Sequence, residues 1–243
     1  MKVAIVGYGK MGRMIESLAP HYGVAVSHRL DIGWTEAELA PRPDAAIEFS
    51  TPEAAVENLE RLAALQIPVV CGTTGWFARL DHVRAAFEKH QTALVYSANY
   101  SIGVNVFQRL AAEAAALLKD ETMYEAWAWE IHHSAKKDAP SGTALALGRA
   151  VAGALNRNLD DVGIHGRKGI SGERSKKEIA LLSVRAGDIV GEHTVIFGGI
   201  GERLEFIHRA HSRDTFAKGA IRAAQWLAGQ NPGLYGMQDV LGL

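Results

Sequence analysis

The chain has 243 residues, of which 48% are hydrophobic and 22% are charged, with 25 glycines. This composition is typical of a globular protein with one large or two small domains, and it excludes disordered and fibrous classes. The formal net charge is -1, from 26 basic and 27 acidic residues, so no overall positive field attracts nucleic acid or an anionic membrane. Any anionic ligand must be attracted by a local cluster of positive charge.

The single cysteine and the N-terminal segment indicate a cytoplasmic protein. Cys71 cannot form a disulfide within the chain, which fits a reducing compartment. The apolar run that follows Met1 is interrupted by glycines and is too short for a secretory signal or a membrane span. We therefore expect a cytoplasmic protein that binds neither membranes nor nucleic acid.

The first hundred residues alternate short β-branched runs with amphipathic helical runs. Strand-like runs occupy residues 2–6, 24–31, 44–50, 67–75 and 92–101, and helical runs occupy residues 13–23, 51–65 and 80–90. Strict alternation of strand and helix is typical of a parallel sheet with helices on both faces. The sequence thus predicts the α/β class, with a doubly wound parallel sheet in a first domain.

The pattern changes after Ser101. Helical spacing recurs at residues 104–119 and 141–155, and strand-like runs follow at residues 122–133, 179–199 and 202–212. This arrangement predicts a central α+β domain with an open mixed or antiparallel sheet. The glycine-rich basic segment 165–177 is expected to be a surface loop.

The last amphipathic helix, at residues 216–230, is expected to return and pack on the first domain. The predicted domains are therefore residues 1–101 with 213–243, and residues 102–212.

Residues 7–12 read GYGKMG, a G-x-G-x-x-G pattern between the first predicted strand and the first predicted helix. Gly7 permits a tight turn, Gly9 lets the backbone approach a pyrophosphate, and Gly12 lets helix and strand pack closely. The N-terminus of the following helix also favours an anion. In this strand–helix–strand context the motif predicts dinucleotide binding rather than a merely structural turn.

The end of the second predicted strand bears on the choice of cofactor. Asp31 lies at the spacing expected for the carboxylate that accepts the adenosine ribose hydroxyls, which is typical of NAD binding. Arg29 could hold the additional phosphate of NADP or simply face solvent. We predict NADH or NADPH as cofactor, with a preference for NADH. The turns at 71–75 and 97–101 follow strands at the same sheet edge, where the nicotinamide end is expected.

Residues 130–144 read EIHHSAKKDAPSGTA and gather two histidines and two lysines ahead of a predicted helix. Glu130 and His132 alternate onto one face of a strand, whereas Lys136 lies on a loop. A metal site is the first alternative. Adjacent histidines on an extended strand diverge, however, no H-x3-H spacing is present, and nearby lysines repel a cation. We therefore predict no metal.

The DAPSGT stretch that follows predicts an anion site. Ser141 is the expected N-cap, so the N–H groups of Gly142 and Thr143 point ahead of the helix. The segment is either a solvated basic loop or a binding site for a dicarboxylate. The dinucleotide motif upstream favours the binding site, because a reductase needs a cationic or proton-donating pocket.

The block 130–144 closely resembles the signature of the dihydrodipicolinate reductase family. These enzymes, also called 4-hydroxy-tetrahydrodipicolinate reductases, belong to the bacterial lysine and diaminopimelate pathway. Further blocks resemble that family in order along nearly the whole chain: EFSTPE, VVCGTTGW, SANYSIGVN, the run from SVRAGDIVGEHTVIF to SRDTFAKGA, and AAQWL. The resemblance implies a Rossmann-like domain, built from the N-terminal part and the last helix. Hinges would join it to a central substrate-binding and oligomerisation domain, usually in a homotetramer.

The resemblance also implies an activity and a set of site residues. The expected activity is NAD(P)H-dependent reduction of (4-hydroxy-)tetrahydrodipicolinate, a cyclic dicarboxylate. His132 would be the catalytic histidine and Lys136 the proton donor. The substrate carboxylates would be held by His133, Gly142 and Thr143. The dinucleotide would be bound by Gly7, Tyr8, Gly9, Lys10, Met11, Gly12, Asp31, Gly72, Thr73, Thr74, Ala98, Asn99 and Tyr100.

The sequence departs from the family pattern at two places. The glycine motif is the compact G-x-G-x-x-G where many members carry GAxGRMG, and the chain is shortened between Asp31 and Pro43. The adenosine end of the site is therefore expected to differ. Two other functions stay open here: a different two-domain oxidoreductase, which the HHSAKKDAPSGT block disfavours, and a nucleotide-sensing binding module. A module that also bound DNA would need a helix-turn-helix or a basic stripe, and we find neither in the sequence.

Overall fold

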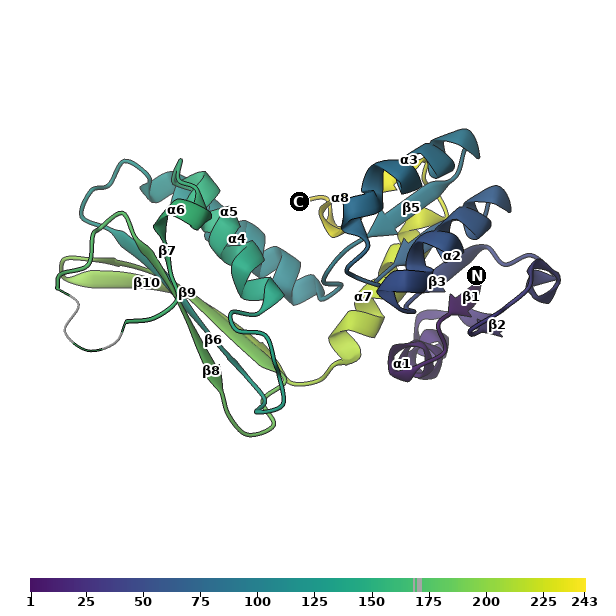
Figure 1. Cartoon of the computed structure of the whole chain (residues 1–243), viewed down its shortest axis with the longest axis horizontal. Coiled ribbons are helices and arrows are strands. Elements are labelled where there is room, and N and C mark those ends of the chain that lie inside the picture. Colours follow the sequence, from purple (N-terminus) through teal and green to yellow (C-terminus); the bar gives the residue numbers. More distant parts are fainter. Residues whose placement is uncertain (168, 170–171) are drawn as a thin grey trace. The chain divides into compact units, whose positions relative to one another are not determined.

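The computed structural model describes residues 1–167, 169 and 172–243 (Figure 1). These residues form two compact units: Met1–Ile102 with Asp214–Leu243, and Gly103–Arg213. The function that the sequence assigned to each domain stays a prediction. The predicted surface loop at 165–177 lies partly outside the described residues, since 168, 170 and 171 are not among them.

The first unit contains a six-stranded parallel sheet with the order β11-β5-β4-β3-β1-β2. Its strands are β1 (Lys2–Val6), β2 (Ala25–Leu30), β3 (Ala45–Glu48), β4 (Val69–Cys71), β5 (Ala93–Tyr96) and β11 (Gly233–Tyr235). The predicted parallel sheet is confirmed. Strand β11 is not predicted from the sequence, because three residues next to glycines are too few to show a strand periodicity.

Helices cover both faces of this sheet. They are α1 (Lys10–Leu18), α2 (Pro52–Ala64), α3 (Leu80–Lys89), α7 (Asp214–Leu227) and α8 (Met237–Leu241), with short 3-10 turns at Ala19–Tyr22, Glu36–Leu39 and Phe77–Arg79. One core cluster joins the sheet to α1 and α7, and a second joins it to α2 and α3. The C-terminal helix α7 therefore packs on the N-terminal sheet, against α1, β3 and β4.

The second unit contains a five-stranded mixed sheet with the order β10-β9-β6-β8-β7. Its strands are β6 (Glu125–His132), β7 (Gly163–Ile164), β8 (Ile179–Arg185), β9 (Gly191–Gly199) and β10 (Glu202–Ala210), and its helices are α4 (Ile102–Leu118), α5 (Gly142–Ala154) and α6 (Leu159–Val162). The central strand β6 runs parallel to β8 and antiparallel to β9. The predicted mixed sheet is thus confirmed.

Helices α4 and α5 pack against one face of the mixed sheet (Figure 1). The side chains that alternate onto the opposite face include a group of apolar ones that are partly exposed, with Ile207 at 46%, next to polar ones such as Glu192 and Thr194. We call this the open apolar face, and it consists of Trp127, Trp129, Ile131, Leu182, Val184 and Ile207. Exposed apolar patches of this kind commonly mark interaction surfaces.

In the part of the chain that the structure describes, no helix combines the length and the apolar character needed to cross a lipid bilayer.

Candidate active site

A cavity of about 650 Å³ lies in the first unit beside the glycine-rich turn. Its lining includes Gly7, Gly9 and Asp31, which the sequence analysis had selected. The cavity occupies the carboxyl edge of the parallel strands, which is where open α/β sheets bind their ligands. Its volume is also in the range of small-molecule and cofactor sites.

Three further side chains form the outer wall of this cavity, and the sequence analysis missed them. Trp34 is buried and donates its indole N–H to Asn58 Oδ1 at 2.8 Å. The guanidinium of Arg61 lies 3.8 Å from the centre of the Trp34 ring and donates to the Trp34 carbonyl at 2.7 Å. The shortened segment after Asp31 therefore folds as a compact turn that is anchored by Trp34. No local sequence motif predicts this tertiary contact.

The glycine-rich turn has the shape that a dinucleotide needs. Gly7 has φ +89°, and a Cβ there would lie 2.2 Å from the carbonyl oxygen of Phe49. At Gly9, the N-cap of α1, a Cβ would meet nothing within 4 Å. A bare helix N-terminus that faces open space is a site for a phosphate group. The residues present therefore fit a pyrophosphate next to the Asp31 carboxylate, which stays a prediction for ribose binding.

A second cavity, of about 270 Å³, lies in the same unit and is lined by Met11, Gly72, Thr73 and Thr74 among others. The first sheet thus places four predicted cofactor residues around one hollow. The Thr73 side chain is also engaged in the fold, because its Oγ1 accepts from the Ser50 N–H at 2.8 Å.

The turn after β5 carries Ala98, Asn99 and Tyr100. Tyr100 is 2% exposed, and its hydroxyl donates to the Cys71 carbonyl at 2.8 Å. Asn99 Oδ1 accepts from the Ser101 N–H at 2.9 Å. Any contact of Tyr100 with a dinucleotide must therefore come from its backbone, since its side chain belongs to the core.

The structure gives Arg29 a partner at the cofactor end. Its Nε donates to Glu16 Oε1 at 2.6 Å, its Nη2 contacts the same oxygen, and the Tyr8 hydroxyl donates to Glu16 as well. The Arg29 hydrogen bond is the main cause that holds the pKa of Glu16 below its ordinary value. Arg29 is therefore not a lone solvent-facing arginine, whereas Asp31 lines the large cavity.

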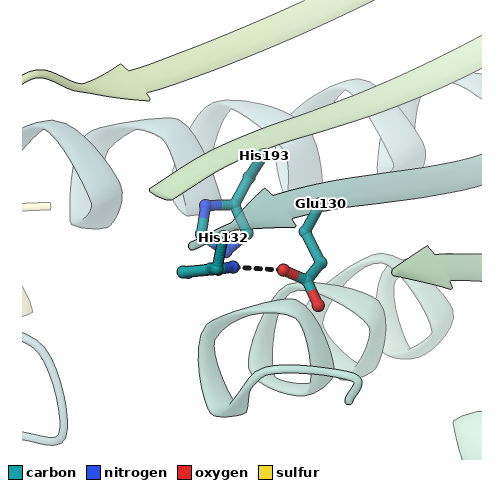
Figure 2. Close-up of side chains that lie close together, drawn as sticks. All are labelled: Glu130, His132 and His193. Atoms are coloured by element: carbon teal, nitrogen blue, oxygen red, sulfur yellow. Dashed lines mark hydrogen bonds and ion pairs between the residues drawn. The ribbon is translucent and has the colours of Figure 1, made fainter. Parts of the chain in front are cut away.

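In the second unit, strand alternation places Glu130 and His132 on the same side of β6. The antiparallel register sets His193 of β9 directly opposite Glu130, and the parallel register sets Arg185 of β8 beside His132. His132 Nδ1 is hydrogen-bonded to the Glu130 carboxylate, and the rings of His132 and His193 lie edge to face with centroids 5.2 Å apart (Figure 2).

Glu130 is 1% exposed, and both of its oxygens are occupied. Arg185 donates to Oε2 through Nη1 at 3.0 Å and to Oε1 through Nη2 at 2.8 Å, and the Ser141 N–H donates to Oε1 at 3.2 Å. Burial alone would raise the pKa of Glu130, but the hydrogen bonds from Arg185 and His132 outweigh burial and lower it. The buried carboxyl is therefore ionised.

The two histidines of this cluster are neutral near pH 7. Burial lowers the pKa of His132, although the hydrogen bond to Glu130 opposes that effect. Burial, and then the neighbouring His132, lower the pKa of His193 to about 4. A neutral imidazole accepts at one nitrogen and donates at the other.

Glu130, His132 and His193 offer ligand-type atoms that all lie within 4.8 Å of one another. This grouping is of the kind that binds zinc. The Arg185 guanidinium, however, already holds both Glu130 oxygens and adds a fixed positive charge. We therefore interpret the cluster as a hydrogen-bonded network, and the sequence-based expectation of no metal stays a prediction.

The loop after β6 is held to the β8–β9 turn through its backbone. The N–H of His133 donates to the Ile189 carbonyl at 2.8 Å, and the His133 Nε2 atom lies 3.3 Å from Nη2 of Arg213. Lys136 donates to both oxygens of Asp138, at 2.7 and 3.0 Å. The lysine is thereby fixed in place by a carboxylate that the sequence analysis did not select.

Ser141 is confirmed as the N-cap of α5, since its Oγ accepts from the Ala144 N–H at 3.1 Å. The same Oγ lies 3.3 Å from His193 Nε2. Gly142 is the first helical residue, and a Cβ there would meet nothing within 4 Å. The start of α5 therefore opens onto free space from a position fixed by the histidine cluster.

Comparison with known proteins finds two family models, one for each part of the chain. The family model described as "Dihydrodipicolinate reductase, N-terminus" matches residues 21–100, and the one described as "Dihydrodipicolinate reductase, C-terminus" matches residues 103–241. Together the two matches span most of the chain.

Two relatives carry the name 4-hydroxy-tetrahydrodipicolinate reductase. The one from Syntrophus aciditrophicus is 54% identical over 200 residues, which cover 82% of this chain and 73% of the relative. The one from Thiobacillus denitrificans is 43% identical over 267 residues, which cover 100% and 99%.

A solved dipicolinate-bound dihydrodipicolinate reductase from Paenisporosarcina sp. TG-14 covers 98% of both chains with a TM-score of 0.79. A probable dehydrogenase from Thermotoga maritima covers 99% of this chain and 92% of its own with a TM-score of 0.64. Since these structures are only 21% and 10% identical to the chain, they support its fold alone.

Proposed function

Because this chain belongs to the dihydrodipicolinate reductase family, we propose that it reduces 4-hydroxy-tetrahydrodipicolinate, a cyclic dicarboxylate, in lysine and diaminopimelate biosynthesis. Its cofactor is a pyridine nucleotide. When bound, the reduced nicotinamide supplies one hydride, and with one proton the reaction yields tetrahydrodipicolinate, the oxidised cofactor and water. The observation that carries the proposal is the geometry of one segment, in which His132 is hydrogen-bonded to a buried carboxylate, Lys136 is held by Asp138, and α5 begins at Gly142.

The proton-handling step falls to Lys136 and His132. Lys136 carries an ammonium group with three donors, and Asp138 orients it. His132 is neutral near pH 7, so it is suited to accept or relay a proton rather than to be the first donor. We assign the proton donated to the substrate to Lys136 Nζ, and the catalytic histidine role to His132.

The substrate carboxylates are assigned to His133 and to the start of α5. Gly142 and Thr143 occupy the first two positions of a 13-residue helix, where backbone N–H groups point outward and the helix dipole favours negative charge. The side chain of His133 lies beside Arg213, so this part of the loop is positively charged. Two carboxylates held in this way orient the ring for reduction.

We propose a preference for NADH over NADPH. Asp31 at the rim of the large cavity suits the two ribose hydroxyls and repels a phosphate at the same place. The only arginine that the sequence analysis offered to that phosphate, Arg29, is bound by Glu16. NADPH would have to compete with this carboxylate, and NADH would not.

We also propose that the protein is cytoplasmic, as its single cysteine indicates, and that it is a homotetramer, as the family resemblance implies. The open apolar face supports self-association, because a sheet face that carries Trp129, Leu182 and Ile207 is costly to leave in water. Light scattering on the purified protein should give a mass four times that of the chain. Leu182→Glu should dissociate the assembly, and a monomeric wild type would contradict the proposal.

The activity itself is tested by following NADH and NADPH oxidation with freshly generated 4-hydroxy-tetrahydrodipicolinate. Turnover with this substrate and a higher kcat/KM for NADH are expected. A panel of amino acids, sugar acids and semialdehydes serves as the control. Turnover of a panel member but not of the cyclic dicarboxylate would contradict the assignment, as would tight NADH binding without turnover of any substrate.

A further inference from the structure

The Glu130 carboxylate is the point at which the two halves of the proposed substrate site meet. On one side it accepts from His132 Nδ1, and on the other it accepts from the backbone N–H of Ser141, the N-cap of α5. Arg185 spans both carboxylate oxygens. One buried side chain therefore touches the proposed catalytic histidine and also the start of the proposed substrate-binding helix.

An ionised carboxylate can only accept hydrogen bonds. When His132 is neutral, the nitrogen that faces Glu130 must therefore carry the proton, and the other nitrogen, Nε2, must carry the lone pair. The tautomer of His132 is thus set by its neighbour on the same strand. This is the arrangement by which a carboxylate orients a catalytic imidazole in unrelated hydrolases.

The surroundings of Nε2 agree with a reacting role for that atom. A Cβ placed on Gly191 of β9 would lie only 3.0 Å from His132 Nε2, closer than an ordinary van der Waals contact, so any side chain at position 191 would crowd this nitrogen. The ionisable groups that face His132 are Glu130, Arg185, His193 and Lys136. Of these, only Glu130 accepts from the ring, and His193 stays neutral.

We infer that Glu130 is the positioning residue of this site. It holds His132 as the Nδ1–H tautomer, presents Nε2 to the substrate, and ties the same geometry to the start of α5. Arg185 keeps Glu130 ionised in a buried place. The inference rests on the proposed reductase activity for its kinetic consequence, but the tautomer itself can be read without turnover.

The first experiment is ¹⁵N NMR of the histidine side chains in the wild-type protein near pH 7.5. His132 is assigned by the signals that disappear in His132→Gln. We expect a protonated Nδ1 and an unprotonated Nε2. A protonated Nε2 in the wild type overturns the inference, even if the protein reduces its substrate normally. The expected tautomer in a protein that turns over no substrate would instead contradict the proposed function.

The second experiment compares Glu130→Gln with Glu125→Gln. Glu125 lies on the same strand and also pairs with an arginine, Arg174, but within the described residues no hydrogen bond or ion pair joins it to His132. In Glu130→Gln we expect kcat to fall about 10²-fold, the Nδ1–H signal to be lost, and the acidic limb of the pH–rate profile to move to lower pH. The limb moves in that direction because Glu130 raises the pKa of His132.

Glu125→Gln should change none of these three readouts. An unchanged kcat and tautomer in a folded Glu130→Gln variant would overturn the inference. If Glu130→Gln does not fold, Gly191→Ala provides the test, since its added methyl group would stand beside Nε2 without altering any charge. We expect Gly191→Ala to lower kcat while NADH binding and the Nδ1–H signal persist. A wild-type kcat in that variant would contradict a reacting Nε2.

Discussion

The proposed cofactor cavity and the histidine cluster are built in opposite ways. The cavity of the first unit takes its predicted residues from short local patterns, with the Gly7 and Gly9 turn at its edge and the Asp31 carboxylate in its lining. The cluster of the second unit is formed by buried ionisable side chains from three strands and one helix start. A site made from local backbone geometry can be recognised from a motif of consecutive residues. A site made from side-chain contacts between distant residues cannot.

The contrast predicts that the largest kinetic effects arise in the second unit. Replacing the proposed proton donor, Lys136→Ala, should lower kcat by about 10²- to 10⁴-fold, the range that a positioned acid contributes. The adjacent Lys137→Ala is the matched control and should stay near the wild-type rate. Steady-state kinetics at saturating NADH measure both. Equal losses in the two variants would show that the loop contributes only general positive charge.

The largest stability effect is expected at the backbone of the first unit. Gly7→Ala forces a side chain into a left-handed turn and against the Phe49 carbonyl, so we expect a loss of about 2–4 kcal/mol in the free energy of unfolding. Gly9→Ala meets no atom within 4 Å and should keep its stability while weakening dinucleotide binding. Urea unfolding and NADH titration separate the two effects. A stable Gly7→Ala variant would contradict the close approach.

The buried histidine of the second unit should make stability depend on pH. His193 has an unfolded-state pKa near 6.5 and a folded-state pKa of about 4. Since the folded pKa is depressed, this contribution is fully present above pH 6.5 and is lost as the pH falls toward 4. Between pH 7 and 4.5 we expect a loss of about 2 kcal/mol from this residue.

That loss is measured by urea unfolding at both pH values, in the wild type and in His193→Gln. The variant should lose less stability than the wild type over the same interval. An identical pH dependence in the two proteins would show that His193 is not held neutral by burial.

The smallest effect is expected for cofactor preference, at the Glu16–Arg29 ion pair of the first unit. Glu16→Gln weakens the hold on Arg29, so the ratio of kcat/KM for NADPH over NADH should rise about two- to five-fold, as is typical of exposed ion pairs. The double variant Glu16→Gln with Arg29→Gln is the control and should show no such rise. If the single variant leaves the ratio unchanged, Arg29 does not take part in cofactor choice.

The difference between local patterns and long-range contacts also decides which features can be predicted from the sequence. The strand–helix alternation, the glycine turn and the Ser141 cap are local patterns, and the structure confirms them. The strand β11 was missed because it is too short for a period, and α1 begins at Lys10 rather than near Arg13 because Gly9 caps it.

Fewer of the site contacts in the second unit can be predicted from the sequence. Strand alternation paired Glu130 with His132 on one face, but only the register of β8 and β9 brings in Arg185 and His193. Arg185 lies 55 positions after Glu130, so this register cannot be read from the EIHHSAKK block. Similarly, Trp34 and Arg61 meet only after the shortened segment has folded against α2. No alternation of polar and apolar residues marks His193 as inward-facing, because Glu192, His193 and Thr194 are consecutive polar residues on β9.

The central claim is that the first unit binds the dinucleotide and the second unit carries the catalytic residues. Its most direct test measures the NADH Kd and the kcat of Asp31→Ala and His132→Gln. The account predicts that Asp31→Ala raises the Kd while kcat at saturating NADH stays near the wild-type value. It predicts the reverse for His132→Gln, with a lower kcat at an unchanged Kd. A His132→Gln variant that loses NADH affinity but keeps kcat would contradict the account.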